Sequence, residues 1–140
     1  MIRLLIADDH PLIRQELKLL LAPEQDMVVS AEAENGAQVL ELLGSGAYEL
    51  LLLDLTMPGL PGPELITRVR ALHGELRILV MSMHNEPQIA RSALWAGANG
   101  YVAKDCEPEI LLTAIRRVAR GERFIDPALQ SYFAGVKHAE

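Results

Sequence analysis

The sequence predicts one α/β domain with a parallel β-sheet between two layers of helices. Five short apolar runs recur along its 140 residues, and each is followed by a segment with helical character. Strict alternation of strand and helix favours a parallel, doubly wound sheet with right-handed crossovers. Five such units are too few for an eight-stranded barrel. A chain of this length can bury a core without covalent staples.

Most of the predicted strands are unbroken apolar runs rather than alternating ones. The run 50–53 consists only of leucines, and such a run is typical of a strand that is buried on both faces. The five predicted strands cover residues 2–7, 27–31, 49–53, 77–81 and 100–103.

The predicted helices are marked by apolar stripes and by start signals. The third helix shows both, because Leu65, Val69 and Leu72 share one face and Pro63 opens the first turn. The other stripes are Ile13, Leu17, Leu20 and Leu21 in the first helix, and Leu111, Ala114, Ile115 and Val118 in the last. The other start signals are Pro11, Asn35 with Gln38, Asn85 with Gln88, and Pro108.

The commonest order for five parallel strands of this kind is 2-1-3-4-5, which is that of a flavodoxin-like (βα)5 domain with helices on both faces. Strands one and three are then neighbours at the topological switch point. Ligands bind such sheets outside the carboxyl ends of the strands. We therefore expect any site to lie at that edge.

We expect this domain to span residues 1–120 and residues 121–140 to form the start of a linker. Asp126 and Pro127 are typical of a helix start and favour a short helix that runs toward Phe133 and Gly135. Apolar residues in this extension predict packing on the same domain or on a neighbour, and the sequence leaves both open. They are Phe124, Ile125, Tyr132 and Phe133.

Composition and charge exclude several classes of protein. The net charge is −6 and 4% of the residues are aromatic, whereas nucleic-acid binding usually requires a basic surface and stacking aromatics. Direct DNA binding is therefore not expected. We expect neither a membrane span nor a signal peptide, because no apolar run approaches ~20 residues. The single cysteine, Cys106, excludes a disulfide framework, which predicts a cytoplasmic domain with an inert thiol.

Polar residues follow the predicted strands where each strand ends. Taken alone, each is most simply a helix cap, a turn residue or a solvated side chain. Taken together, they lie on one edge of the predicted sheet and predict a common site. Asp8 and Asp9 follow the first strand, Asp54 the third, Ser82 the fourth and Lys104 the fifth.

The residue types at this edge predict phosphoryl chemistry with a divalent cation. Crowded carboxylates repel one another, and Mg²⁺ relieves this while keeping waters that a phosphoryl group displaces. Asp54 ends the most apolar strand and is the candidate nucleophile, with Lys104 neutralising the transferred oxygens. The histidines have no zinc-ligand spacing, so even His10 beside the pocket is interpreted as a structural or surface residue.

Short sequence motifs surround these strand-end residues. They are Asp8-Asp9, Asp54-Leu55-Thr56-Met57-Pro58-Gly59, Ser82 and Tyr101-Val102-Ala103-Lys104. In this combination they resemble the receiver domain of bacterial two-component response regulators, over about residues 1–120. Softer phrases are most similar to the NarL/FixJ-type (LuxR-type) transcriptional regulators: Asp8-Asp9-His10-Pro11, Ala96-Gly97-Ala98-Asn99-Gly100-Tyr101 and Arg120-Gly121-Glu122-Arg123.

The resemblance implies a phosphoacceptor switch rather than an enzyme, apart from Mg²⁺-dependent self-phosphorylation and self-dephosphorylation. It implies that Asp54 accepts a phosphoryl group from a sensor histidine kinase. It further implies that Mg²⁺ is bound by Asp9, Asp54 and the backbone carbonyl of Thr56, and by Asp8 through a water. The implied output is transcription, through a helix-turn-helix domain that these 140 residues do not contain.

The resemblance also implies how the phosphoryl group is sensed. Ser82 moves toward one phosphoryl oxygen, Lys104 pairs with another, and Tyr101 changes rotamer as Ser82 shifts. Only a state with better contacts to the new charge gains population. Taken alone, Tyr101 is equally consistent with an ordinary half-buried strand aromatic. A homodimer that forms on phosphorylation is a further implied partner.

Three residues depart from the family pattern or extend it. Asp105 follows the lysine where many members have a cis proline, which predicts a trans peptide bond. Met83 is bulky beside the phosphoryl position and is expected to change the lifetime of the acyl phosphate. Trp95, the single tryptophan, is either part of the core or an exposed interface contact.

Three rival functions are weaker. A haloacid dehalogenase-type phosphatase needs an aspartate two residues after its nucleophile, where this chain has Thr56. Flavin binding needs a loop rich in glycine and hydroxyl residues after the first strand, where Asp8 and Asp9 repel phosphate. A receiver that docks partners without phosphorylation does not explain why every site position holds a competent residue.

Overall fold

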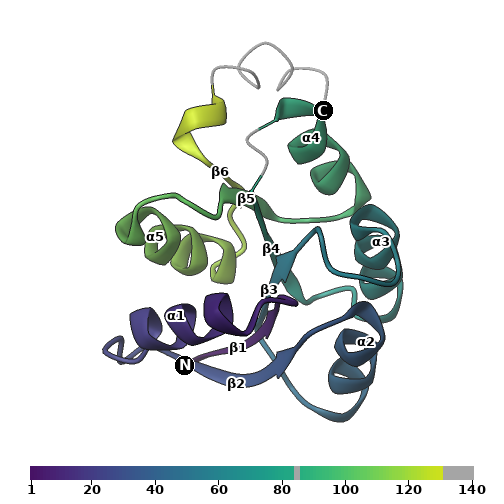
Figure 1. Ribbon diagram of the computed structural model, residues 1–140, viewed down its shortest axis with the longest axis horizontal. Helices are drawn as coiled ribbons and strands as arrows, with labels where there is room; N and C mark the ends of the chain where they lie inside the picture. The colour runs from purple at the N-terminus through teal and green to yellow at the C-terminus, as the bar shows by residue number, and fades with distance from the viewer. Residues whose placement is uncertain (84–85, 131–140) are drawn as a thin grey trace.

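The computed structural model describes residues 1–83 and 86–130 and contains the predicted alternation of strands and helices (Figure 1). The first five strands are β1 (Ile2–Ala7), β2 (Met27–Ala33), β3 (Leu50–Asp54), β4 (Arg77–Ser82) and β5 (Gly100–Ala103). The helices are α1 (Pro11–Leu21), α2 (Gly36–Ser45), α3 (Gly62–Leu72), α4 (Pro87–Ala96) and α5 (Pro108–Ala119).

The strand order begins as predicted but the number of strands does not match. Within the described residues the sheet is parallel and has six strands in the order β2-β1-β3-β4-β5-β6, so the prediction of five is wrong. The additional strand, β6 (Phe124–Ile125), pairs with Gly100 and Tyr101 of β5. A two-residue strand shows no periodicity, which is why the sequence did not indicate it. Gly100 permits the pairing, since a Cβ there would lie 2.9 Å from the carbonyl oxygen of Phe124.

Residues 121–130 therefore pack on their own domain rather than leaving it at once. Phe124 and Leu129 are buried, and the helical turn η1 (Pro127–Leu129) follows β6. The turn is a short 3-10 helix that begins where the sequence predicts a helix. The expected continuation of that helix, with Tyr132, Phe133 and Gly135, lies outside the described residues.

The side chains of each central strand contribute to two hydrophobic cores, one on each face of the sheet. In β3, Leu51 and Leu53 pack beneath α2, α3 and α4, whereas Leu50 and Leu52 pack beneath α1 and α5. Figure 1 shows these two groups of helices on opposite sides of the sheet. Neighbouring side chains of a strand point to opposite faces. An unbroken apolar run is thus explained by burial on both sides.

The helix starts agree with the sequence signals where the structure describes them. Asn35 caps α2 by accepting a hydrogen bond from the backbone N–H of Gln38 at 2.9 Å. Proline occupies the first turn of the other four helices. The predicted signal at Asn85 lies outside the described residues. None of the helices that the structure describes is both long and apolar enough to cross a bilayer.

The central position of β3 leads to a stability prediction. Leu52 has no exposed surface, so Leu52→Ala should lower the free energy of unfolding by about 2–5 kcal/mol through lost burial and a cavity. Leu72→Ala is the matched control, because Leu72 is 69% exposed and its loss should change stability by less than about 0.5 kcal/mol. Urea unfolding measures both, and equal effects would contradict the two-core description.

Candidate functional site

The order of the strands brings the predicted carboxylates together. Asp8 directly follows β1, and Asp54 is the last residue of β3. These strands are hydrogen-bonded neighbours, with Ala7 opposite Leu53. The side chains of Asp8 and Asp54 are both fully buried at this edge of the sheet.

Lys104 reaches both buried carboxylates from β5. Its Nζ atom lies 2.8 Å from Oδ2 of Asp8 and 3.2 Å from Oδ2 of Asp54, and its side chain is 4% exposed. Because β4 separates β3 from β5, the long lysine side chain crosses the end of β4. The ammonium group therefore holds two strand ends together electrostatically.

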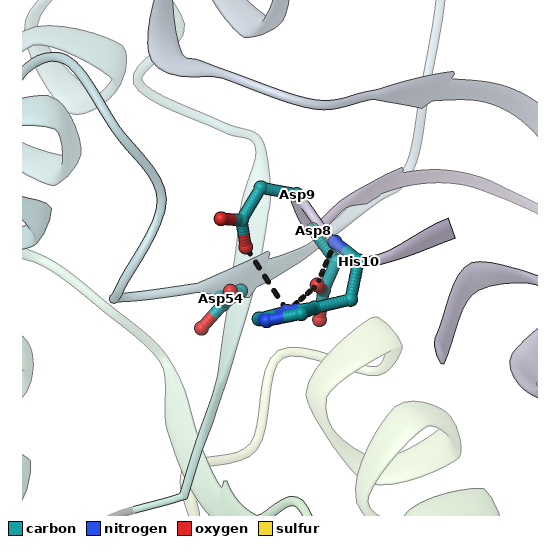
Figure 2. Close-up of side chains that lie close together, drawn as sticks. All are labelled: Asp8, Asp9, His10 and Asp54. Atoms are coloured by element: carbon teal, nitrogen blue, oxygen red, sulfur yellow. Dashed lines mark hydrogen bonds and ion pairs between the residues drawn. The ribbon is translucent and has the colours of Figure 1, made fainter. Parts of the chain in front are cut away.

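Asp9 and His10 complete a group of four ligand-type side chains. Nδ1 of His10 lies 3.0 Å from Oδ1 of Asp8 and 3.1 Å from Oδ1 of Asp9. The four candidate ligand atoms of Asp8, Asp9, His10 and Asp54 all lie within 4.8 Å of one another. Figure 2 shows these side chains converging from the ends of β1 and β3. The sequence placed His10 beside the pocket as a structural or surface residue, and the structure shows that its imidazole contacts two of the carboxylates.

The oxygens of this group fit a hard cation. Among the described residues, three buried carboxylate oxygens make ion-pair contacts in place of hydrogen bonds: Oδ2 of Asp8 and Oδ2 of Asp54 face the Lys104 ammonium group, and Oδ1 of Asp9 faces the His10 imidazole. In their charged forms the three carboxylates exceed the charge of the Lys104 ammonium group by two units. Clustered carboxylate oxygens with unused lone pairs are the ligands that Mg²⁺ and Ca²⁺ prefer. The site therefore has the chemistry of a divalent cation site.

Thr56 holds one oxygen of Asp54 and leaves the other facing the pocket. Oδ1 of Asp54 accepts hydrogen bonds from the backbone N–H of Thr56 at 3.1 Å and from its hydroxyl at 2.8 Å. Oδ2 faces Lys104 instead. The carboxylate is thereby fixed with one oxygen directed at the ammonium group.

Ser82, the last residue of β4, and Tyr101, within β5, form a second polar pair. Both residues are fully buried, and their side chains are hydrogen-bonded to each other. Burial raises the pKa of the Tyr101 hydroxyl, and the hydrogen bond with Ser82 partly opposes that rise. The backbone also connects this pair to the first group, since the N–H of Lys104 donates to the carbonyl of Ser82 at 2.8 Å.

Comparison with known proteins identifies this arrangement. The family model described as "Response regulator receiver domain" matches residues 4–116. The chain belongs to this family. The receiver domain is 41% identical over 136 residues to the nitrate/nitrite response regulator protein NarL of Escherichia coli K12, covering 97% of this chain and 63% of the relative.

Other relatives give the same family assignment. A probable transcriptional regulatory protein NarL of Mycobacterium tuberculosis is 34% identical, covering 96% of this chain and 62% of the relative. The receiver domain thus spans less than two thirds of the length of these two proteins. The crystal structure of a LuxR-family two-component response regulator from Aurantimonas sp. SI85-9A1 matches with a TM-score of 0.91 at 31% identity, covering 100% of this chain and 99% of that one.

The residues that depart from the family pattern also have defined positions. Trp95, on α4 of the receiver domain, is 92% exposed, so the core alternative for it is wrong. Met83 is 68% exposed directly after β4. No peptide bond in the described residues is cis, which confirms the trans bond predicted before Asp105.

The environment of Cys106 leads to a prediction about its reactivity. Burial, followed by the charges of Asp126 and Asp105, raises the pKa of this thiol to about 11. Since only the thiolate reacts, labelling by a disulfide reagent at pH 8 should be about a hundredfold slower than for a free cysteine with a pKa of ~8.5. The rate should rise about tenfold per pH unit above that. The same protein unfolded in urea is the control, and equal folded and unfolded rates would contradict this pKa.

Proposed function

We propose that this receiver domain is a phosphoacceptor switch in which Asp54 takes a phosphoryl group from a sensor histidine kinase. The observation that supports this most strongly is the placement of the Lys104 ammonium group between the buried carboxylates of Asp8 and Asp54. A carboxylate beside an ammonium group and a candidate cation site can act as a nucleophile toward phosphorus. The family assignment of residues 4–116 agrees with this role.

In this proposal, the cation is Mg²⁺, held by the side chains of Asp9 and Asp54 and by the backbone carbonyl of Thr56, with Asp8 acting through a water. The buried oxygens that accept no hydrogen bond support this assignment. When bound, Mg²⁺ neutralises charge on the transferred phosphoryl oxygens.

In the transfer step, the two carboxylate oxygens of Asp54 have different roles. Thr56 holds Oδ1, so Oδ2 attacks phosphorus. The new O–P bond forms as the P–N bond of the donor phosphohistidine breaks, and the released imidazole keeps its electron pair. Lys104, 3.2 Å from Oδ2 before the reaction, then pairs with a phosphoryl oxygen. Charge placed at this position is stabilised most where water is excluded.

The Ser82–Tyr101 pair is proposed as the sensor of the phosphoryl group. Ser82 lies at the end of β4, and its carbonyl accepts from the N–H of Lys104. When Ser82 turns toward a phosphoryl oxygen, its hydrogen bond with Tyr101 is exchanged for a bond to a stronger acceptor. Tyr101 is buried against the core beneath α4, so its rotamer change alters the packing of that helix.

The proposed output is transcription, exerted through a DNA-binding domain and a dimer. The M. tuberculosis relative is named a probable transcriptional regulatory protein, which supports this output for the longer proteins of the family. We assign Trp95 to an interface contact, because an indole that is 92% exposed is typical of residues that carry binding energy. In this proposal, the DNA contacts are made by a domain other than the receiver domain.

The chemistry does not favour a phosphatase that turns over small esters. Such an enzyme needs a general acid near the nucleophile, and Thr56 uses its hydroxyl as a donor to Asp54 instead. The reaction expected of this domain is one self-phosphorylation event from a reactive donor, followed by slow self-dephosphorylation.

Labelling by a small phosphodonor tests the proposed nucleophile. Acetyl phosphate with MgCl₂ should add one phosphoryl mass to the wild-type protein and none to Asp54→Ala, because the attacking oxygen is gone. Asp105→Ala removes an exposed carboxylate next to Lys104 and should label like the wild type. Intact-protein mass spectrometry measures all three, and removing Mg²⁺ with EDTA should abolish the label.

Two outcomes of that labelling would contradict the proposal. Equal labelling of Asp54→Ala and wild type would show that another residue is the acceptor. Full labelling in EDTA would show that the carboxylate cluster of Asp8, Asp9 and Asp54 does not act through a cation.

Met83 provides a test of the lifetime of the phosphorylated form. Its side chain follows Ser82 directly and is exposed at the edge where the site opens. Met83→Ala should shorten the half-life of the acyl phosphate severalfold, because water reaches phosphorus more easily. Leu72→Ala, a distant exposed change on α3, should leave the half-life unaltered. Decay of the phosphoryl mass after donor removal measures this, and a longer half-life would show that Met83 does not shield the site.

A further inference from the structure

A buried carboxylate outside the described site makes contacts that the proposed mechanism does not use. Asp126 is 4% exposed and lies between β6 and η1, beyond the residues 4–116 that match the family model. Burying a carboxylate costs free energy unless it is hydrogen-bonded. Its partners therefore indicate what it does.

One oxygen of Asp126 takes the place of a backbone carbonyl in the sheet. The ladder between β5 and β6 ends where the N–H of Asp126 donates to the carbonyl of Tyr101 at 2.8 Å. The N–H of Ala103, the last residue of β5, donates to Oδ2 of the Asp126 side chain at 2.9 Å. The side chain thus extends a two-residue strand to the end of its neighbour. Without it, this buried donor has no partner in the ladder.

The other oxygen ties the carboxylate to the following turn. Oδ1 of Asp126 accepts from the N–H of Ala128 at 2.9 Å and caps η1. Leu129, at the end of η1, is buried in the core beneath α4. Asp126 is consequently held in place by packing as well as by hydrogen bonds.

The bond to Ala103 acts on the residue that precedes Lys104. On one side, Lys104 is tied to β4 through its N–H and the carbonyl of Ser82, at 2.8 Å. On the other side, the end of β5 is tied to Asp126. The backbone from which the lysine side chain leaves is therefore fixed from both sides, and from that position its ammonium group contacts both Asp8 and Asp54.

We propose that Asp126 is a positioning residue for Lys104 and that β6 and η1 are part of the phosphorylation machinery. This inference rests on the proposed function of Asp54 and Lys104. It assigns to the segment after residue 120 a task in the chemistry rather than the task of a linker alone. Misplacement of a positioned group by ~1 Å can cost about a hundredfold in rate. Loss of the Asp126–Ala103 hydrogen bond, which loosens the backbone beside Lys104, should therefore slow the labelling of Asp54 measurably.

Two complementary substitutions separate positioning from simple stabilisation. Asp126→Ser keeps the cap of η1, because serine is a good capping residue, but its side chain is too short to reach Ala103 as well. In Asp126→Asn, the amide oxygen placed toward Ala103 keeps that acceptor, and the NH2 group then stands opposite the N–H of Ala128, which loses its acceptor. Hydrogen exchange of the Ala103 amide, followed by NMR, should be faster in Asp126→Ser and close to wild type in Asp126→Asn.

The test combines this exchange measurement with labelling kinetics in the full 140-residue chain. With acetyl phosphate and MgCl₂, Asp126→Ser should lower the maximal rate of labelling on Asp54 by about tenfold, within the range that misplacement of a catalytic group produces. The Mg²⁺ dissociation constant, measured by calorimetry, should stay unchanged, since the carboxylates of Asp8, Asp9 and Asp54 are intact. Asp126→Asn should restore the rate.

The outcomes distinguish this inference from the proposed function. Labelling of Asp126→Ser at the wild-type maximal rate would overturn the positioning role, as would an equal loss of rate in both variants. A wild-type protein that takes no phosphoryl group on Asp54 would instead overturn the proposed function itself.

Discussion

Two carboxylates without exposed side-chain surface, those of Asp8 and Asp54, share one ammonium group, and the rest of the site depends on that pairing. Removing charges from water costs several kcal/mol per ion unless each finds a partner. Here the partner, Lys104, comes from a strand two positions away from β3. Only the strand order that sets β1 beside β3 and keeps β5 within reach allows the three groups to meet. The sheet topology is therefore a condition of the chemistry.

The pairing leaves the site short of positive charge, and this charge imbalance favours the binding of a cation. One ammonium group serves Oδ2 of both Asp8 and Asp54, and Oδ1 of Asp9 contacts only the His10 imidazole, so the three carboxylates carry more negative charge than Lys104 balances. A divalent cation would offset this excess negative charge, and in the proposed function Mg²⁺ also holds the phosphoryl group at the site. A phosphorylated aspartate then changes the charge at one point between two packed layers. The Ser82–Tyr101 hydrogen bond joins that point to the core beneath α4.

The sequence was sufficient for the features that depend on long apolar runs and on strand ends. The leucines of β3 predicted a strand buried on both faces, and the polar residues after each run predicted where Asp8, Asp54 and Lys104 meet. It was insufficient where the signal lies in one or two residues. The strand β6 has only two residues, and the contact of His10 with Asp9 depends on a rotamer. A third example is Arg70 of α3, whose guanidinium group donates to the backbone carbonyls of Gly97 and Leu76. These contacts require α3, β4 and α4 to be packed together, which the sequence alone does not show. Asp126 was visible as a helix start, but its bond to Ala103 required the sheet.

Paramagnetic broadening by Mn²⁺ in a ¹⁵N-labelled sample tests most directly whether the carboxylates form one cation site. A substoichiometric amount of Mn²⁺ should broaden the amide signals around Asp8 to His10 and around Asp54 to Thr56 together. Signals at the opposite edge of the sheet, near Arg77 at the start of β4, should broaden much less, because the effect falls steeply with distance from the ion. Broadening of only one of the two groups, or of neither, would show that these carboxylates do not share an ion, and the account of the site would then be wrong.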